Sequence, residues 1–225
     1  MSKITDNAFL FQKTFGTSGV NAIGSFQLSQ LNSSSVKSKL KAAGINTNSK
    51  QYKAAVKQMM SAGNGAMYGN IQGIKNLMSH YDKDGDYINP VNGLSGLLVT
   101  DENESSRKKI ISIPDSSKEE MYELTKKEFL RENGVCNGDT TRRSDVYNNL
   151  YRKMQKKDRL AAGYTLEKYE RIYRQAFYDA AKKADPNWEI GKPIKEGALD
   201  NVTRESIEAK KSGFICMALG PSKLL

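Results

Sequence analysis

Apolar residues recur every three or four positions between residues 166 and 184, and this helical period is the strongest constraint on the fold. Such spacing places the side chains on one face of an amphipathic helix. Thr165 precedes the segment as an N-cap residue, and Pro186 lies just beyond its end, where a helix cannot continue. The apolar positions are Leu166, Tyr169, Ile172, Tyr173, Ala176, Phe177 and Ala180.

The same period predicts further helices elsewhere in the chain. Ser117 and Glu120 form a capping box that predicts a helix start at Ser117, whereas the last helix, from Thr203, lacks one because Ser206 stands three residues on. The other helices are expected from about Ser35, Ser49 and Ala66 and around Val146–Met154. Two short apolar runs, 97–99 and 110–113, predict a small hairpin. Together these patterns predict a mostly-α protein: a single compact helical domain of six or seven helices, with at most a short β-hairpin.

Composition suggests three parts along the chain. Residues 1–34 are rich in Ser, Asn, Gly, Gln and Thr without a sustained period, which predicts a flexible leader. Residues 35–212 carry the helical pattern and form the predicted helical domain. Residues 213–225 form a tail whose apolar run, Phe214–Leu219, is too short to span a bilayer. We expect no transmembrane segment. The compartment stays open between cytoplasm, as the default, and export without a leader.

Positive charge is concentrated near the N-terminus. The chain has 35 basic and 25 acidic residues, for a net charge of +10. Residues 1–65 hold eight lysines, no arginine and one acid, Asp6. A basic balance favours nucleic acid, anionic membrane or an acidic partner. Arginine is the usual bidentate reader of phosphate, whereas the lysine ammonium is strongly hydrated, so we favour a solvated charge and keep nucleic-acid binding as the alternative. The densest later basic stretch is Arg142, Arg143, Arg152, Lys153, Lys156, Lys157 and Arg159.

An acidic loop is the best candidate site. Asp82, Asp84 and Asp86 alternate directly after a helical segment, as the first three ligands of a calcium-binding EF-hand loop do. Tyr87 stands where that loop has Gly, and Gly93 where it has Glu. Three carboxylates in one tight turn repel each other unless a cation or amide donors compensate. The sequence therefore predicts either an Asp-rich turn or a structural Ca²⁺ site with a shell completed from elsewhere. The candidates are Asn89, Asn92, the Tyr87 carbonyl oxygen, water, or a distant carboxylate of Asp101, Glu102 or Glu104.

Other chemistry is weakly indicated. His80 is the only histidine, so a Cys/His zinc site is disfavoured, and a dyad with Cys136 would have to use that residue. No common catalytic motif occurs, so whether the protein is an enzyme stays open, with the balance against it. Tyr169, Tyr173 and Phe177 form a stripe on one helix, and Tyr147 and Tyr151 lie at the same spacing on the preceding helix. These rings predict an aromatic seam between two packed helices in preference to a stacking platform for bases or a peptide groove.

Seven short segments of the chain form a familiar combination: Met67–Tyr68, Tyr81–Ile88, Asn133–Val135, Asn137–Thr141, Tyr169–Arg171, Tyr173–Phe177 and Ala184–Trp188. Together they resemble an uncharacterised bacterial family of Gram-positive species, known only as a domain of unknown function. The resemblance covers about residues 45–210 and implies no activity, cofactor or site residue. It does imply that the leader and the extreme C-terminus are peripheral.

These patterns together favour a non-enzymatic binding or assembly protein with a structural calcium site at Asp82, Asp84 and Asp86. A protein partner is expected, with the leader and the apolar tail as candidate contacts. A nucleic-acid-binding protein that uses its basic helices is the alternative, and an enzyme of unknown class is the second alternative. The sequence leaves the oligomeric state open.

Overall fold

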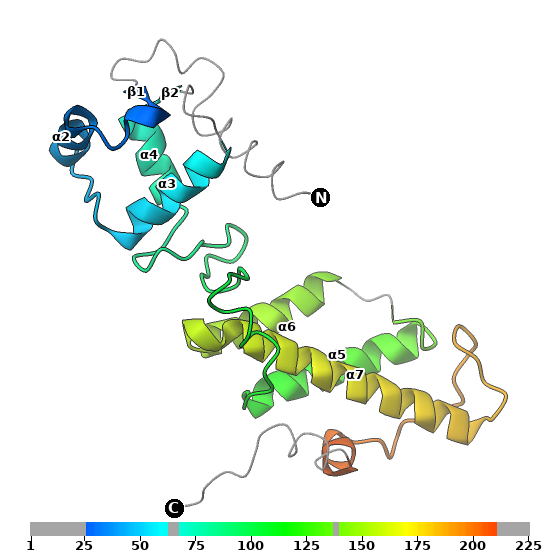
Figure 1. The fold of residues 1–225 in the computed structure, drawn as a ribbon. Coiled ribbons are helices and arrows are strands. Elements are labelled where there is room, and N and C mark those ends of the chain that lie inside the picture. The colour runs from blue at the N-terminus through cyan, green and yellow to red at the C-terminus, as the bar shows by residue number, and fades with distance from the viewer. Residues whose placement is uncertain (1–25, 63–67, 137–139, 211–225) are drawn as a thin grey trace, which may run out of the picture. The chain divides into compact units, whose positions relative to one another are not determined.

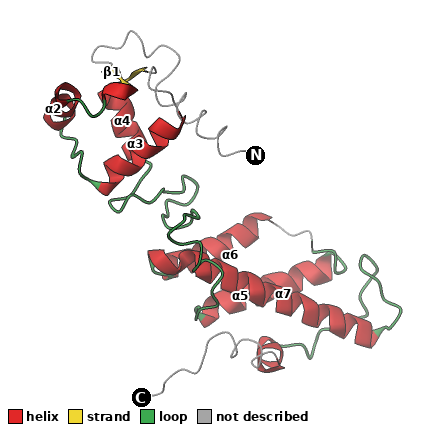
Figure 2. Cartoon of the chain, viewed as in Figure 1, coloured by secondary structure: helices red, strands yellow, loops and turns green. Residues whose placement is uncertain are grey.

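The computed structural model describes residues 26–62, 68–136 and 140–210, and most of their regular structure is helical (Figure 2). The mostly-α prediction is confirmed. Contacts between Cα atoms divide the chain into two compact units, residues 1–98 and residues 99–225. The sequence suggested one compact helical domain, whereas the structure has two units that each have a hydrophobic core of their own. Figure 1 labels the elements of both units.

The first unit packs three helices around one core. Its elements are β1 (Phe26–Gln27), the 3-10 helix η2 (Leu28–Gln30), α2 (Ser34–Ala42), α3 (Lys50–Ala62), β2 (Tyr68–Gly69) and α4 (Ile71–Met78). The helices expected from Ser35 and Ser49 are present. The Ser33 hydroxyl caps α2 by accepting a hydrogen bond from the amide of Val36. The Gln51 side chain donates to the carbonyl oxygens of Met78 and Tyr81, which ties α3 to the end of α4.

Part of the predicted leader, residues 26–34, belongs to the fold of the first unit. Phe26, Leu28 and Leu31 are buried in the core of the first unit, together with Val36 and Leu40 of α2. These few residues form a strand and a 3-10 turn, which are too short to show a helical period in the sequence. Burial of their apolar side chains holds the segment against the helices. Residues 1–25 of the predicted leader lie outside the described residues.

The short strand pair lies in a different place from the predicted hairpin. Residues 97–99 and 110–113 form no strand, whereas Phe26 pairs with Gly69 and Gln27 with Tyr68 in antiparallel register. The pairing also explains why α4 begins at Ile71 and not near Ala66. Residues 68–69 are in the strand, and the Asn70 side chain then caps the helix by accepting from the amide of Gly73 at 2.7 Å.

The second unit packs α7 against α5 and α6. Its elements are α5 (Asp115–Arg131), α6 (Thr140–Lys153), the 3-10 helix η3 (Lys156–Asp158) and α7 (Arg159–Ala184), and residues 204–210 are helical again. Gly163 allows the close approach of α6 and α7, because a Cβ atom there would lie 2.6 Å from the Tyr151 hydroxyl. The predicted tail, residues 213–225, lies outside the described residues.

The stripe on α7 forms an aromatic seam, as predicted, but its partner rings lie on α5. The two tyrosines that the sequence offered as partners, Tyr147 and Tyr151 of α6, pack on each other at 6.1 Å. The ring of Phe177 lies 5.6 Å from that of Tyr122 and 5.8 Å from that of Phe129, both on α5. Tyr173 meets Tyr122 edge to face at 5.5 Å. Trp188, beyond the end of α7, packs on Phe129 at 5.9 Å. These rings carry the largest apolar surfaces of the unit and are buried together.

Two predicted helix starts were too late, by six residues at Thr165 and by two at Ser117. The helix expected from Thr165 begins at Arg159, and the Thr165 hydroxyl donates within the helix to the carbonyl oxygen of Ala161 at 2.8 Å. The helix expected from Ser117 begins at Asp115 after Pro114, and Ser117 is fully buried. Both side chains face packed neighbours, and burial in the tertiary structure overrides their usual preference for caps.

The last helix, residues 204–210, has an N-terminal capping box, although its sequence lacks the Glu or Gln that this motif usually has. The amide of Ser206 donates to the Thr203 hydroxyl, and the amide of Thr203 donates to the Ser206 hydroxyl, both at 3.2 Å. Serine thus takes the part of the Glu or Gln that normally closes a capping box. The reciprocal bonds fix where residues 204–210 begin.

Candidate functional site

The acidic loop after α4 is a closed turn. Tyr81 and Tyr87 form an antiparallel bridge across it, and the amide of Asp82 donates to the carbonyl oxygen of Asp86 at 2.9 Å. Gly85 has a φ angle of +85° in the tip, and a Cβ atom there would lie 3.0 Å from the carbonyl oxygen of Lys50. The turn therefore needs glycine at this position, both for its backbone angle and for its contact with α3.

The carboxylate of Asp82 is used inside this turn. Its Oδ1 atom accepts from the amides of Asp84 at 2.9 Å and Asp86 at 3.0 Å. Its Oδ2 atom accepts from the Ser95 hydroxyl at 2.7 Å. This is the way in which an aspartate stabilises a turn, with its side chain standing in for a backbone acceptor. The amide donors partly neutralise the charge of Asp82, which reduces its repulsion by the neighbouring carboxylates.

The structure does not gather a metal cluster from these acids. Among residues 26–62, 68–136 and 140–210, no group of three or more His, Cys, Asp or Glu side chains could hold a metal ion. The two amides expected to complete the shell accept from nearby backbone amides instead: Asn89 from Val91 and Asn92 from Leu94. The role of Asp82, Asp84 and Asp86 as Ca²⁺ ligands stays a prediction.

A buried charge cluster lies in the second unit, between α5, α6 and α7. The guanidinium of Arg143 donates to Glu128 at 2.6 Å and to Glu170 at 2.6 Å. Arg174 also donates to Glu170, one turn away on the same helix. Glu128 is 1% exposed and Glu170 is 7% exposed. The pKa of Arg143 is raised overall. Burial by itself would lower it, but the hydrogen bonds and negative charges of Glu128 and Glu170 more than offset that effect.

This cluster and its neighbouring thiol are built for stability more than for chemistry. Each buried carboxylate is paired with an arginine, which is the arrangement that makes a buried charge tolerable. Burial raises the pKa of the Cys136 thiol, and the nearby charges of Arg174 and Arg143 offset only part of the effect. Cys136 is 8% exposed. A buried, protonated thiol is a poor nucleophile.

The basic stretch from Arg142 to Arg159 is partly used within the fold. Arg143 belongs to the buried cluster, and Nε of Arg159 donates to the carbonyl oxygen of Tyr151 at 3.1 Å. Lys153 contacts the hydroxyl of Ser116 at 3.1 Å. The stretch is therefore not one continuous exposed surface for phosphates, because these cations serve contacts between helices.

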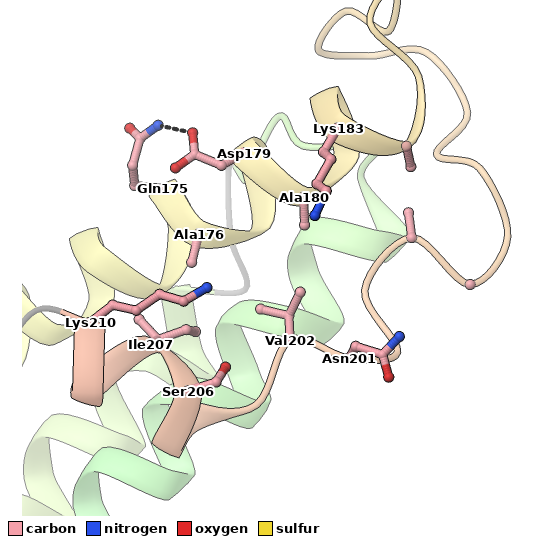
Figure 3. A pocket seen from close by; sticks show the side chains of 13 residues that line it. Gln175, Ala176, Asp179, Ala180, Lys183, Asn201, Val202, Ser206, Ile207 and Lys210 are labelled. Carbon is pink, nitrogen blue, oxygen red and sulfur yellow. Dashed lines mark hydrogen bonds between the residues drawn. The ribbon is translucent and has the colours of Figure 1, made fainter.

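The second unit also contains a groove, between the C-terminal half of α7 and the chain from Gly197 to Lys210. Its volume is about 540 Å³, which lies within the range of ordinary ligand pockets of roughly 300–1,000 Å³. In Figure 3, Ala176 and Ala180 on α7 lie across the groove from Val202 and Ile207. Ala184 and Ala198 also line it. The polar lining residues are Gln175, Asp179, Lys183, Asn201, Ser206 and Lys210.

The wall opposite α7 is firmly attached. Ile207 is buried in the core of the unit. The Tyr173 hydroxyl donates to the Glu208 carboxylate at 2.6 Å, and the Tyr122 hydroxyl donates to the carbonyl oxygen of Val202 at 2.5 Å. Burial raises the pKa of Tyr173, and the bond to Glu208 raises it further, so this donor keeps its proton. The groove is thus formed before any ligand binds.

Sequence reasoning did not identify this groove. Ala176 and Ala180 were assigned to the packed face of the helix, and Ala184 was not assigned. One feature of the sequence could have indicated it: these alanines are four residues apart, which gives α7 one side with only small side chains. What covers that side depends on residues 197–210, and the helical period says nothing about their position.

Comparison with known proteins places the chain in a family. The model of the family described as Domain of unknown function (DUF3879) matches residues 45–215. The chain belongs to the DUF3879 family. The match spans residues of both compact units and includes every residue that lines the groove. No curated protein and no solved structure matches the chain. Within the described ranges of this DUF3879 protein, no helix is long and apolar enough to cross a membrane.

Replacing Asp82 with Ala should lower the free energy of unfolding of this DUF3879 protein by about 1–3 kcal/mol in calcium-free buffer. The variant leaves two amides and one hydroxyl without their acceptor. Urea unfolding followed by circular dichroism measures the loss, and Asp101→Ala, at an exposed acid in another turn, should change it by less than about 0.5 kcal/mol. A wild-type midpoint unmoved by millimolar Ca²⁺ would count against the predicted ion site.

Replacing Arg143 with Ala should cost about 3–5 kcal/mol, because it leaves the Glu128 carboxylate buried without its arginine and Glu170 with Arg174 alone. Trp188 is buried in the same unit, so its fluorescence during urea unfolding reports the change. Arg171→Ala is the matched control. It removes an exposed pair with Glu167 on α7 and should cost about 0.3–0.5 kcal/mol. Equal losses in the two variants would show that the cluster is not a stabilising contact.

Proposed function

We propose that this DUF3879 protein is a non-enzymatic binding or assembly protein whose groove receives a short apolar segment of a protein partner. The observation that carries the proposal is the composition of the groove. Its apolar floor is made of Ala176 and Ala180 on α7 and of Val202 and Ile207 across from them, and charged and amide side chains complete the lining. In Figure 3 the side chains of Lys183 and Lys210 reach between the two sides. An apolar floor with a polar rim is the usual anatomy of a protein-binding surface.

Small side chains on the floor favour a peptide over a bulky compact surface. The alanines of α7 are spaced four residues apart and therefore form a row on one side of the helix. Their small side chains leave room for the side chains of an incoming segment. Burial of apolar surface stabilises such a complex by about 25 cal/mol for each Å² removed from water. Gln175, Asp179 and Lys183 follow the same side of α7 and offer both donors and acceptors to the peptide.

The groove is also prepared for binding. The hydrogen bonds of Tyr122 and Tyr173 and the buried side chain of Ile207 hold the second wall against α5 and α7. A wall that is already in place loses little conformational entropy when a ligand arrives. The pocket contains no cluster of buried nucleophilic or titratable groups among its lining residues, so binding, and not a reaction, is the activity it supports.

Selection from a library of random twelve-residue peptides tests the proposal. Peptides rich in apolar residues should be enriched on the full chain, and Ala180→Glu should weaken the binding of each by at least about tenfold, or ~1.4 kcal/mol. The reason is that the new carboxylate would be buried against the apolar peptide. Ala42→Glu introduces the same charge at an exposed position of α2 and should leave binding unchanged. If the enriched peptides bind the Ala180→Glu variant as tightly as the wild type, the groove is not their binding site.

A second candidate function, nucleic-acid binding, has one specific observation in its favour. Between Phe26 and Met78 the chain carries seven lysines and no acidic residue. All seven are exposed, and Lys50, Lys53 and Lys57 share one face of α3 by their spacing. None of the described residues pairs with these lysines in an ion pair, so their charge is open to phosphates.

Salt dependence distinguishes this second function. A labelled thirty-nucleotide RNA should bind the full chain in fluorescence anisotropy, with an affinity that falls steeply between 50 and 200 mM salt, by about tenfold or more if three phosphates are neutralised. Gln at the three α3 lysines should weaken binding and flatten the slope. The control carries the same loss of charge in the other unit, at Lys108, Lys127 and Lys195. Equal effects of the two triple variants, or no binding at 50 mM salt, would exclude an α3 site.

A further inference from the structure

We infer that the groove is occupied in the free protein by the chain's own segment Phe214–Leu219, which a partner must displace. The inference rests on the proposed function, because it names the competitor for the same groove. It follows from three observations: the apolar floor of the groove, the composition of the segment, and the position of Lys210, which lines the groove and directly precedes the tail.

The chemistry of the segment fits the floor. Phe214, Ile215, Met217 and Leu219 are large and apolar, and the run carries no charge. The floor opposite is built from alanines and from Val202 and Ile207. Large side chains against small ones fill a groove without overpacking it. An uncharged segment also passes the mixed charges of Asp179, Lys183 and Lys210 without a repulsive pair.

The tether is short and correctly placed. Three residues, Lys211, Ser212 and Gly213, separate Lys210 from Phe214. Ser-Gly is a dipeptide that favours a turn, which the chain needs in order to reverse and enter the groove. Closing so short a loop costs little entropy. The attachment gives the segment an effective concentration in the millimolar range, so that occupation in cis is favoured over a free peptide of equal affinity.

Self-occupation gives the groove a regulatory property. A partner segment binds only in competition with the tail, so its apparent affinity is reduced by the fraction of chains in which the groove is already filled. Polar substitutions in the tail, Ile215→Ser with Leu219→Ser, should therefore raise the affinity of any peptide that the groove selects, by about tenfold or more at an effective concentration ten times its dissociation constant.

Disulfide trapping in the full chain tests where the segment lies. Cys216 is in the middle of the segment, and Cys136 is buried and does not compete. Cys216 should pair with a cysteine placed in the groove by Asp179→Cys. Arg171→Cys is the matched control: both positions are exposed on α7, and each variant removes one i, i+4 side-chain contact, Gln175–Asp179 or Glu167–Arg171.

The control distinguishes a tail that is bound in the groove from a tail that is only attached close to it. Six residues reach about 20 Å from Lys210 when extended, which exceeds the separation of about 12 Å between the two engineered positions along α7. A disulfide requires Cα atoms within about 7 Å of each other. With diamide as oxidant, we expect the intramolecular disulfide to form at least tenfold faster with Asp179→Cys than with Arg171→Cys. Ile215→Ser with Leu219→Ser should abolish the difference.

Several outcomes would overturn the inference. They are equal rates at the two positions, no disulfide at either, or a bond found only in a covalent dimer, which would make a second copy the occupant. Non-reducing gels and peptide mapping distinguish them. The result is independent of the peptide selection. Groove-dependent peptides without preferential trapping would leave the binding function intact and refute self-occupation. Preferential trapping without any selected peptide would leave the tail as occupant and refute the binding function.

Discussion

The aromatic contact between α5 and α7 is the interaction on which the second unit depends. Tyr122 and Phe129 of α5 meet Tyr173 and Phe177 of α7, and Trp188 closes one end of the row. Once this face of α7 is buried, the rotation of the helix about its axis is fixed. The adjacent row of Ala176, Ala180 and Ala184 must then face residues 197–210, and the groove lies between them. Core packing and the candidate binding surface are thus consequences of one orientation.

Charge is handled differently in the two units. In the second unit, arginines are brought to carboxylates inside the fold, as at Arg143 with Glu128 and Glu170, so cations there act as structural elements. In the first unit, residues 26–78 contain no acid, and the lysines stay exposed. Arginine suits the buried role because its planar guanidinium pairs with two carboxylates at once, and lysine suits the solvated one. The basic character of the chain therefore has two separate physical meanings.

Much of the fold was predictable from the sequence, and most of the misses share one cause. Helix periods found α2, α3, α6 and α7, and the stripe on α7 predicted an aromatic seam. Cap rules failed at Ser117 and Thr165, where burial decides the role of a hydroxyl, and they missed the local cap that Thr203 forms with Ser206. Segment 26–31 was missed because a strand and a 3-10 turn of a few residues carry no period. Local patterns predict local structure, and apart from the Thr203 cap these misses depended on packing against distant segments.

The candidate sites show the same division. The sequence by itself determined which residues share a helix face, that the acidic loop is a turn, and that the alanines of α7 form a row, because each of these depends on neighbours within four positions. Only the tertiary structure decided that Asp82 also binds the Ser95 hydroxyl, which lies in a separate part of the loop, and that residues 197–210 lie over the alanine row. Both contacts join separate segments of the chain, and no local period records which segments meet.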